Sequence, residues 1–188
     1  RDESGRVTHY VSVGRDVTSR VKKERDLLQA ATLDRLTGLF NRHQGERSLS
    51  ERYAAAVASG APLALIMCDI DHFKSINDSF GHPAGDRVIR QVTQVLRGAV
   101  RASDPVVRWG GEEFLVVLSD CTMARAKEVA ELMRVRVESA EDAQVGRVTL
   151  SLGVAALQPQ EPLEDFIHRC DQALYQSKRT GRNRVTSG

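Results

Sequence analysis

Residues 108–114 read RWGGEEF and stand between two short apolar runs at 106–107 and 114–118. A Gly-Gly pair between β-branched runs predicts a two-residue hairpin, because such a turn requires positive φ values. Two carboxylates, Glu112 and Glu113, follow the glycines at once, and neighbours on a strand point to opposite faces. An acidic hairpin tip suits a divalent cation. A solvated acidic turn is the alternative that this stretch alone leaves open.

A further carboxylate is expected at the end of another strand. Residues 63–68 (LALIMC) form a continuous apolar run, which predicts a central strand buried on both faces, and Asp69 closes it. In a β-α-β-β arrangement this strand and the hairpin are neighbours, so Asp69 and one hairpin carboxylate are expected to approach each other. Two close carboxylates repel unless a cation lies between them. For Asp69 alone, a simple strand-end acid or a helix cap is an equal alternative.

The remaining pattern predicts an α+β fold. Helices are expected over 41–59 with Asn41 as N-cap, from near Pro83, over 122–139 and over 163–179, and strands over 148–155 and 184–186. The core order is β-α-β-β-α-β, with one extra helix before and one after. That order is the ferredoxin-like, palm-type pattern of an antiparallel central sheet with helices packed on one side.

The first 32 residues follow a different pattern. Residues 1–16 are interpreted as a hairpin remnant that turns at Gly5. Over residues 17–31, positions four and three residues apart form a short heptad seam, which predicts a coiled-coil linker helix, although a solvated helix is the alternative. Residues 33–188 then form the main domain. The chain begins without Met, which we interpret as the start of a fragment.

Composition excludes several classes of function. The chain has 27 Lys and Arg against 25 Asp and Glu, so its net charge of +2 gives no argument for a nucleic acid polymer or an acidic membrane as partner. Three widely spaced cysteines indicate reduced thiols of a cytoplasmic domain rather than disulfides or a zinc site. No apolar run approaches a membrane span, so any membrane segment would have to lie outside this chain.

Two further groups of residues could bind a nucleotide. Asn77 offers both a donor and an acceptor, and Asp86 offers acceptors to ring NH groups, so together they could recognise a guanine edge. Each alone is more often a turn or helix-start residue. Basic residues crowd around Gly181, where they could hold phosphates or stabilise a helix C-terminus. They are Lys178, Arg179, Arg182 and Arg184.

Together these motifs resemble the GGDEF family of bacterial diguanylate cyclases. The resemblance extends from Asp34 to Val185, and the motifs stand in the family's order. They are residues 34–42 (DRLTGLFNR), 69–74 (DIDHFK) with 77–78 (ND), 81–86 (GHPAGD), 110–114 (GGEEF), 151–153 (SLG), and 171–175 (DQALY) with Lys178 and 181–183 (GRN). Residues 1–16 similarly look like the remnant of a PAS sensor domain, with 17–32 as the linker helix and 33–188 as the catalytic domain.

The resemblance implies roles for the matched residues. The ligands of Mg²⁺ (or Mn²⁺) would be Asp69, the Ile70 carbonyl, Glu112 and, as a weaker candidate, Glu113. The substrate-binding residues would be His72, Phe73, Asn77, Asp86, Gly110, Gly111, Lys178 and Arg182. The catalytic residues would be Glu112, which helps to activate a 3′-hydroxyl, and Lys74, which stabilises developing phosphate charge.

The implied activity is the condensation of two GTP molecules into cyclic di-GMP with release of two pyrophosphates. One domain would hold one GTP, so two copies must face each other as a homodimer. The Arg-x-x-Asp run at 101–104 implies an inhibitory product-binding site of Arg101 and Asp104, with Arg134 as a second arginine, whereas a helix-end turn is the alternative. A non-catalytic GTP or cyclic di-GMP receptor, a cyclase with another cyclic dinucleotide product, and a pure dimerisation module are the competing functions.

Overall fold

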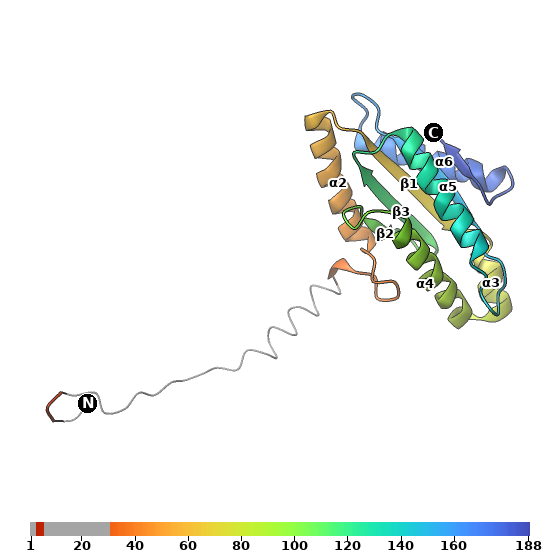
Figure 1. Cartoon of the computed structure of the whole chain (residues 1–188), viewed down its shortest axis with the longest axis horizontal. Coiled ribbons are helices and arrows are strands. Elements are labelled where there is room, and N and C mark those ends of the chain that lie inside the picture. The colour runs from red at the N-terminus through yellow and green to blue at the C-terminus, as the bar shows by residue number, and fades with distance from the viewer. Residues whose placement is uncertain (1–2, 6–30) are drawn as a thin grey trace. The chain divides into compact units, whose positions relative to one another are not determined.

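The structure is a computed structural model that describes residues 3–5 and 31–188. The chain divides into two compact units, Arg1–Ala31 and Thr32–Gly188. In the first unit the described residues form a turn in which Gly5 has a φ of 80°. The rest of the expected hairpin remnant, and the expected linker helix up to residue 30, lie outside the described residues. Figure 1 shows the elements of the second unit.

Five strands of the second unit form one mixed sheet in the order β2-β3-β1-β4-β5. Their bounds are β1 (Leu63–Ile70), β2 (Val106–Arg108), β3 (Glu113–Ser119), β4 (Leu150–Ala156) and β5 (Val185–Ser187). The central strand β1 is antiparallel to β3 and β4, whereas β5 pairs with β4 in parallel. The predicted α+β fold with an antiparallel central sheet is therefore confirmed. All of β1 is buried, as its apolar run predicted.

The helices cover both faces of the sheet, so the prediction of one covered face is wrong (Figure 1). The helices on one face are α3 (Phe73–Phe80), α4 (His82–Ala99) and α5 (Met123–Ser139), and those on the other are α2 (Arg42–Ser59) and α6 (Leu163–Arg179). Of these, α3 was not predicted. None of the helices within residues 31–188 is long and apolar enough to cross a membrane.

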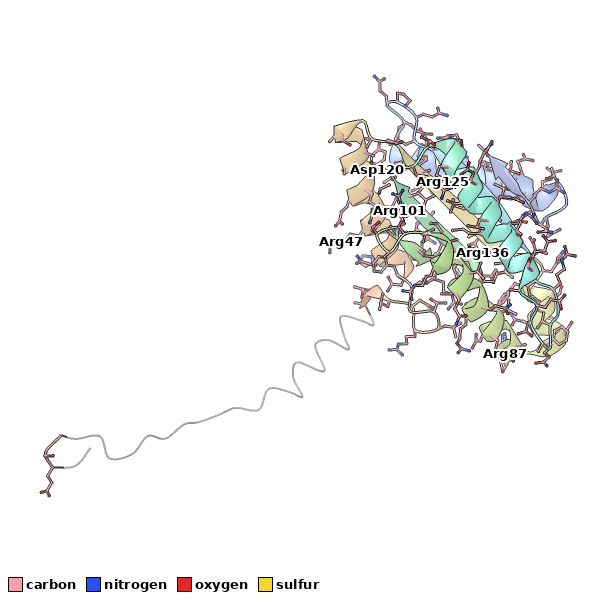
Figure 2. All side chains as sticks on the ribbon, viewed as in Figure 1. Arg47, Arg87, Arg101, Asp120, Arg125 and Arg136 are labelled. Atoms are coloured by element: carbon pink, nitrogen blue, oxygen red, sulfur yellow. The ribbon has the colours of Figure 1, made fainter. Side chains whose placement is uncertain are left out.

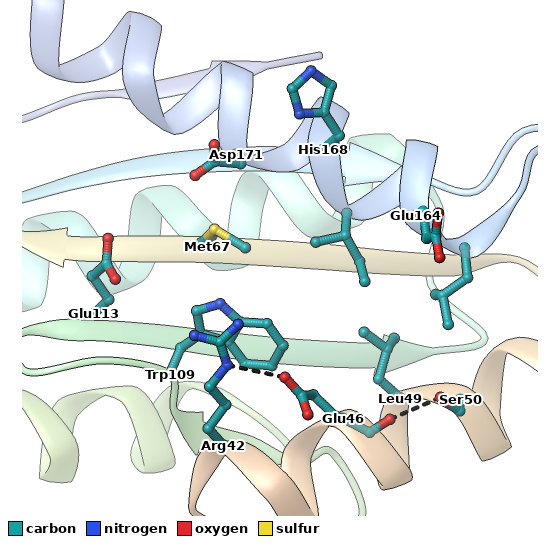
Figure 3. A pocket seen from close by; sticks show the side chains of 12 residues that line it. Arg42, Glu46, Leu49, Ser50, Met67, Trp109, Glu113, Glu164, His168 and Asp171 are labelled. Atoms are coloured by element: carbon teal, nitrogen blue, oxygen red, sulfur yellow. Dashed lines mark hydrogen bonds and ion pairs between the residues drawn. The ribbon is translucent and has the colours of Figure 1, made fainter.

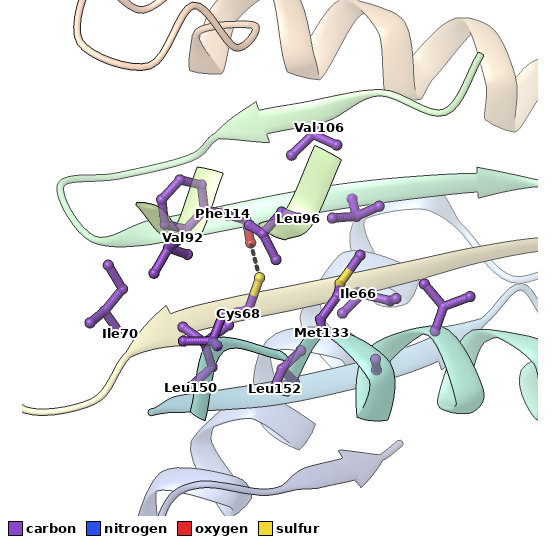
Figure 4. Close-up of a cluster of buried hydrophobic side chains, with 14 of the residues drawn as sticks. Ile66, Cys68, Ile70, Val92, Leu96, Val106, Phe114, Met133, Leu150 and Leu152 are labelled. Carbon is purple, nitrogen blue, oxygen red and sulfur yellow. Dashed lines mark hydrogen bonds between the residues drawn. The ribbon is translucent and has the colours of Figure 1, made fainter. Parts of the chain in front are cut away.

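Alternation along β1 divides the interior into two cores. Ile66 and Cys68 pack with α4 and α5 in the core that Figure 4 shows, while Leu65 and Met67 pack with α2 and α6. Successive side chains of a strand point to opposite faces, so a strand that is apolar at every position needs a helical layer on each side. The second layer matters for the site, because it brings the C-terminal end of α6 to the end of β1.

The hairpin forms at the predicted place but through a different turn. The Trp109 N–H donates to the Glu113 carbonyl at 2.8 Å, so residues 110–112 make the turn. Neither Gly110 nor Gly111 has a positive φ, so the predicted two-residue turn is wrong. The guanidinium of Arg108 instead donates to the Gly111 carbonyl at 2.7 Å. A side-chain contact therefore holds this turn, and the glycines do not supply a left-handed backbone.

Candidate active site

The predicted acidic segments meet at one end of β1. Asp69 lies directly opposite Glu113 across the antiparallel β1–β3 pair, which places both side chains on the same face of the sheet. The next backbone N–H, that of Ile70, donates to the Glu112 carbonyl at 3.2 Å. The strand end therefore fixes the backbone of both hairpin acids next to Asp69.

The Asp69 carboxylate is short of compensating charge. It is only 9% exposed, and its partner is the Lys178 ammonium at 2.7 Å. Burial raises the pKa of Asp69 to about 6; Lys178 opposes this shift, while the charges of Glu112 and Glu113 add to it. The negative charges of Glu112 and Glu113 thus act on Asp69 beside its ion pair with Lys178, and a further cation would relieve this repulsion.

The residues at this strand end fit a divalent cation. Within residues 3–5 and 31–188, no three His, Cys, Asp or Glu side chains form a ready-made metal cage. Magnesium does not require one, because it commonly takes one or two carboxylates and completes its shell with water and substrate phosphates. Asp69, the hairpin acids and the Ile70 carbonyl offer only oxygen donors, which Mg²⁺ and Mn²⁺ prefer.

Asp69 gives a stability prediction for the metal-free protein. Its carboxyl has an ordinary pKa of 3.8 and a folded-state pKa of about 6, so the folded chain holds this proton more tightly. Asp69 therefore destabilises the fold increasingly as the pH rises from about 4 to about 6, and no further above that range. In EDTA, the melting temperature of Asp69→Asn minus that of the parent should increase as the pH rises from about 4 to about 6. A difference that is independent of pH would contradict the shift.

The turn after β1 leads directly into a helix N-terminus. His72 adopts a left-handed conformation (φ 57°), and α3 begins at Phe73. Free N–H groups and the helix dipole make such a terminus suited to phosphate. Lys74 is exposed in the first turn of α3, and Lys178 reaches the same strand end from the last turn of α6. Cationic side chains and backbone N–H groups that could bind phosphate thus lie next to the acidic cluster at the end of β1.

The two candidate guanine-binding residues come from adjacent helices. Asn77 lies on α3 and Asp86 on α4, and Gly85 lets the two helices approach closely. A Cβ at Gly85 would stand 2.1 Å from Asn77 Oδ1, so a larger residue there would displace the amide. Asn77 Oδ1 is enclosed without a hydrogen-bond partner among the described residues, which leaves part of this amide's bonding capacity unused.

The candidate inhibitory residues lie away from the acidic cluster, before β2. Arg101 and Asp104 close a tight turn through reciprocal backbone and carboxylate bonds, and they line a cavity of about 180 Å³ with Asp120 and Arg125. Figure 2 labels Arg101, Asp120 and Arg125 in this region.

Arg134, the expected second arginine, does not line the cavity at Arg101 and Asp104. Its guanidinium binds Glu131, Glu138 and Asn183 instead. These three partners use nearly all of its donors, so the structure does not bring Arg134 to the inhibitory site. Arg125, which the sequence did not single out, supplies the α5 arginine at this cavity.

A groove lies between α2 and α6. It has a volume of about 560 Å³, and of the predicted site residues only Glu113 lines it (Figure 3). Trp109, at the base of the hairpin, also lines the groove and packs beneath the Arg42 guanidinium at 4.9 Å. The groove therefore borders the hairpin on the sheet face that carries Glu113 and Asp69, and none of the residues expected to bind nucleotide lines it.

Two supporting contacts were missed from the sequence. Asp34 pairs with Arg108, the residue that holds the Gly111 carbonyl. Burial acts to raise the pKa of Asp34, but hydrogen bonds from Thr37 and Arg108 more than offset it and leave the pKa below its usual range. Asp71, two residues beyond Asp69, accepts a bond from the backbone N–H of Asn183. No local pattern predicts either contact, because each joins segments distant in sequence.

Comparison with known proteins shows the family to which a chain with this site belongs. Residues 31–184 match the family model described as "Diguanylate cyclase, GGDEF domain". The chain belongs to this family. The GGDEF domain is 37% identical over 170 residues to the diguanylate cyclase DgcM of Escherichia coli (strain K12). The match covers 90% of this chain and 42% of DgcM, so the chain spans less than half the length of that relative.

Solved structures share the fold of this GGDEF domain. The coiled coil and GGDEF domain of DgcB from Caulobacter crescentus, in complex with c-di-GMP, superposes with a TM-score of 0.84 at 36% identity, covering 92% of this chain and 96% of that one. The active GGEEF domain of a diguanylate cyclase from Vibrio cholerae superposes with a TM-score of 0.75 at 35% identity, covering 78% and 96%. The palm-type α+β fold expected from the sequence is thus the fold of these GGDEF domains.

Proposed function

We propose that this GGDEF domain is a diguanylate cyclase, which condenses two GTP molecules into cyclic di-GMP and releases two pyrophosphates. The observation that carries the proposal is the meeting of Asp69, the hairpin acids and Lys178 beside the N-terminus of α3. Carboxylates for a cation and donors for phosphates are the two components that phosphoryl transfer requires. The diguanylate cyclase DgcM, the c-di-GMP complex of DgcB and the active diguanylate cyclase domain from Vibrio cholerae support the same reaction.

Positioning and electrostatics would carry most of the catalysis. The backbone at His72 and Phe73, with Lys178 and Arg182, would hold the triphosphate, and Asn77 with Asp86 would hold guanine. Asp69, Glu112 and the Ile70 carbonyl would hold Mg²⁺ or Mn²⁺, with Glu113 as a weaker ligand; the cation would neutralise charge on the transferred phosphate. Glu112 would draw the proton from the attacking 3′-hydroxyl, and Lys74 would stabilise the developing negative charge.

The reaction would need two copies of the domain. Each copy would hold one GTP, and each 3′-hydroxyl must reach the α-phosphate of the other molecule. The proposed association element is the heptad seam over 17–31, which lies outside the described residues. Pyrophosphate release from GTP and Mg²⁺ tests the proposal, and activity per molecule should rise with protein concentration. The absence of any release at high protein and GTP concentrations would instead favour a receptor function.

Feedback inhibition gives a separable prediction. Arg101→Ala should abolish tight binding of cyclic di-GMP while leaving initial turnover largely intact, because a guanidinium binds phosphates and guanine edges in a fixed planar geometry. The site lies in the turn before β2, whereas the hairpin acids follow that strand and Asp69 lies in β1. Product bound there would therefore act at a second site and hold two active sites apart.

Binding of cyclic di-GMP by calorimetry, together with progress curves, measures this effect. Arg47→Ala is the matched control, since Arg47 is an exposed arginine on α2 whose ion pair within the described part of the chain is with Glu51 at 3.0 Å. If Arg101→Ala still binds cyclic di-GMP as tightly as the parent and is equally inhibited, residues 101–104 are only a turn.

A further inference from the structure

The segment that follows α6 has an unusual backbone. Gly181, Arg182 and Asn183 have consecutive positive φ values of 117°, 58° and 45°. Residues with a Cβ rarely adopt the left-handed region, so two in succession require contacts that hold them there. Arg182, one of the proposed phosphate-binding residues, lies in the middle of this segment.

A buried carboxylate holds the backbone of the segment. Asp71 is 5% exposed, and its Oδ2 accepts a bond from the Asn183 N–H at 3.0 Å. The same side chain accepts bonds from the hydroxyls of Thr149 and Ser151 at 2.7 and 2.6 Å. Because Asp71 is two residues beyond Asp69, the segment that carries Arg182 is tied to the strand end that carries the proposed metal ligand.

Two side chains of α5 hold the Asn183 amide from both ends. Arg134 Nη1 donates to Asn183 Oδ1 at 2.8 Å, and Asn183 Nδ2 donates to Glu138 Oε1 at 2.9 Å. Arg134 also binds Glu138 at 2.6 Å, which closes the triangle, and its side chain is only 15% exposed. A closed set of charge-assisted bonds fixes the amide in one orientation.

We propose that Arg134 and Asn183 are positioning residues that hold Arg182 in place for the phosphates of the nucleotide. This inference rests on the proposed function, because it takes the phosphates of GTP to lie at Lys178 and Arg182. Neither Arg134 nor Asn183 needs to touch the nucleotide. They act through the left-handed backbone of residues 181–183. Loss of the contacts that orient metal ligands typically costs about 10- to 100-fold in affinity or activity, and we expect the lower end of this scale here.

The test compares two nucleotides that share a base but differ in phosphates. The probes are 3′-deoxy-GTP, which lacks the attacking hydroxyl and so is not turned over, and 3′-deoxy-GMP. With Mg²⁺ present, Arg134→Ala should weaken binding of the triphosphate about 10-fold and leave binding of the monophosphate nearly unchanged. Asn183→Gly should do the same, because glycine tolerates the positive φ but lacks the amide that Arg134 and Glu138 hold.

Two comparisons make the result specific. Arg136→Ala is the matched control, since Arg136 is an exposed arginine two residues along α5 that donates to the Gly98 carbonyl at 3.1 Å. Figure 2 labels Arg136 on α5. In Arg182→Ala, adding Arg134→Ala should weaken triphosphate binding no further, because the two residues act as one unit.

Each alternative outcome overturns a different claim. Equal weakening of both nucleotides in Arg134→Ala, or full additivity with Arg182→Ala, would mean that the Arg134–Asn183 contact only supports the fold. If Arg182→Ala weakens the triphosphate but neither Arg134→Ala nor Asn183→Gly does, this inference alone fails. If Arg182→Ala has no effect, the phosphate assignment within the proposed function fails, and the inference fails with it.

Discussion

Glu112→Gln is expected to lower turnover by at least ~100-fold, a scale typical of the loss of one charged group that stabilises a transition state. The substitution keeps the size of the side chain and removes its negative charge. Glu112 precedes Glu113, which pairs with Asp69, and the Glu112 carbonyl accepts a bond from the Ile70 N–H. These backbone contacts do not use the Glu112 side chain, so the turn itself should persist. The substitution therefore weakens the proposed metal site and at the same time removes the proposed acceptor of the 3′-hydroxyl proton. Steady-state pyrophosphate release measures the effect.

Glu51→Gln is the matched control for this change, because Glu51 is an exposed acid on α2 that pairs with Arg47. The control should retain parental turnover and melting temperature. Near-normal turnover in Glu112→Gln, with the fold intact, would show that Glu112 is neither a metal ligand nor a base, and the assignment of the hairpin would have to be abandoned.

The preference for GTP over ATP should reach about 10⁴-fold in kcat/KM, since a site built to hydrogen-bond a substrate group strongly rejects analogues that lack it. Asp86 offers a carboxylate to the ring NH and amino group of guanine, and adenine presents an acceptor at the equivalent ring position. Binding adenine would therefore leave the carboxylate without its donors. Asp86→Ala should reduce the preference sharply, mainly by impairing the use of GTP.

The neighbouring Arg87→Ala is the control, because Arg87 lies on the same helix and contacts Gln144 at 2.7 Å, outside the proposed base site. It should keep the parental ratio of GTP to ATP use. Equal use of both nucleotides by the parent protein would contradict the roles of Asn77 and Asp86.

Elements with strong local signals were predictable from the sequence. The helix α2 has the expected cap, in which the Asn41 side chain accepts a bond from the Gln44 N–H at 3.0 Å, and Gly60 ends it with a φ of 71°. β1 was predicted because six successive apolar residues satisfy burial on both faces. The same run requires a helical layer on each face of the sheet, which the predicted one-sided arrangement does not provide.

Elements that depend on distant contacts were not predictable. The helix α3 has the sequence FKSINDSF, in which Ser, Asn and Asp are weak helix formers. Its formation depends on burial of Phe73 and Ile76, and on the close approach to α4 that Gly85 allows. Likewise, the hairpin turn depends on Arg108 and, through it, on Asp34, 74 residues earlier in the chain.

The candidate site shows the same division between features with a local sequence signal and features that depend on distant contacts. The residue types and order of the acidic and basic motifs were visible in the sequence, and β1 pairing with β3 brings Asp69 opposite Glu113 as expected. The placement of Arg134 was not predictable, because helical spacing does not reveal which neighbour an exposed-looking arginine contacts. Its partner Asn183 lies 49 residues away and is fixed by the segment after α6.

The most direct test of the central claim is the mass of the product that the purified chain forms from GTP and Mg²⁺. The account predicts cyclic di-GMP and two equivalents of pyrophosphate for each equivalent of product, with no reaction when EDTA replaces the metal. Formation of GDP and phosphate, of a linear dinucleotide only, or of no product from a folded chain that binds GTP would contradict it.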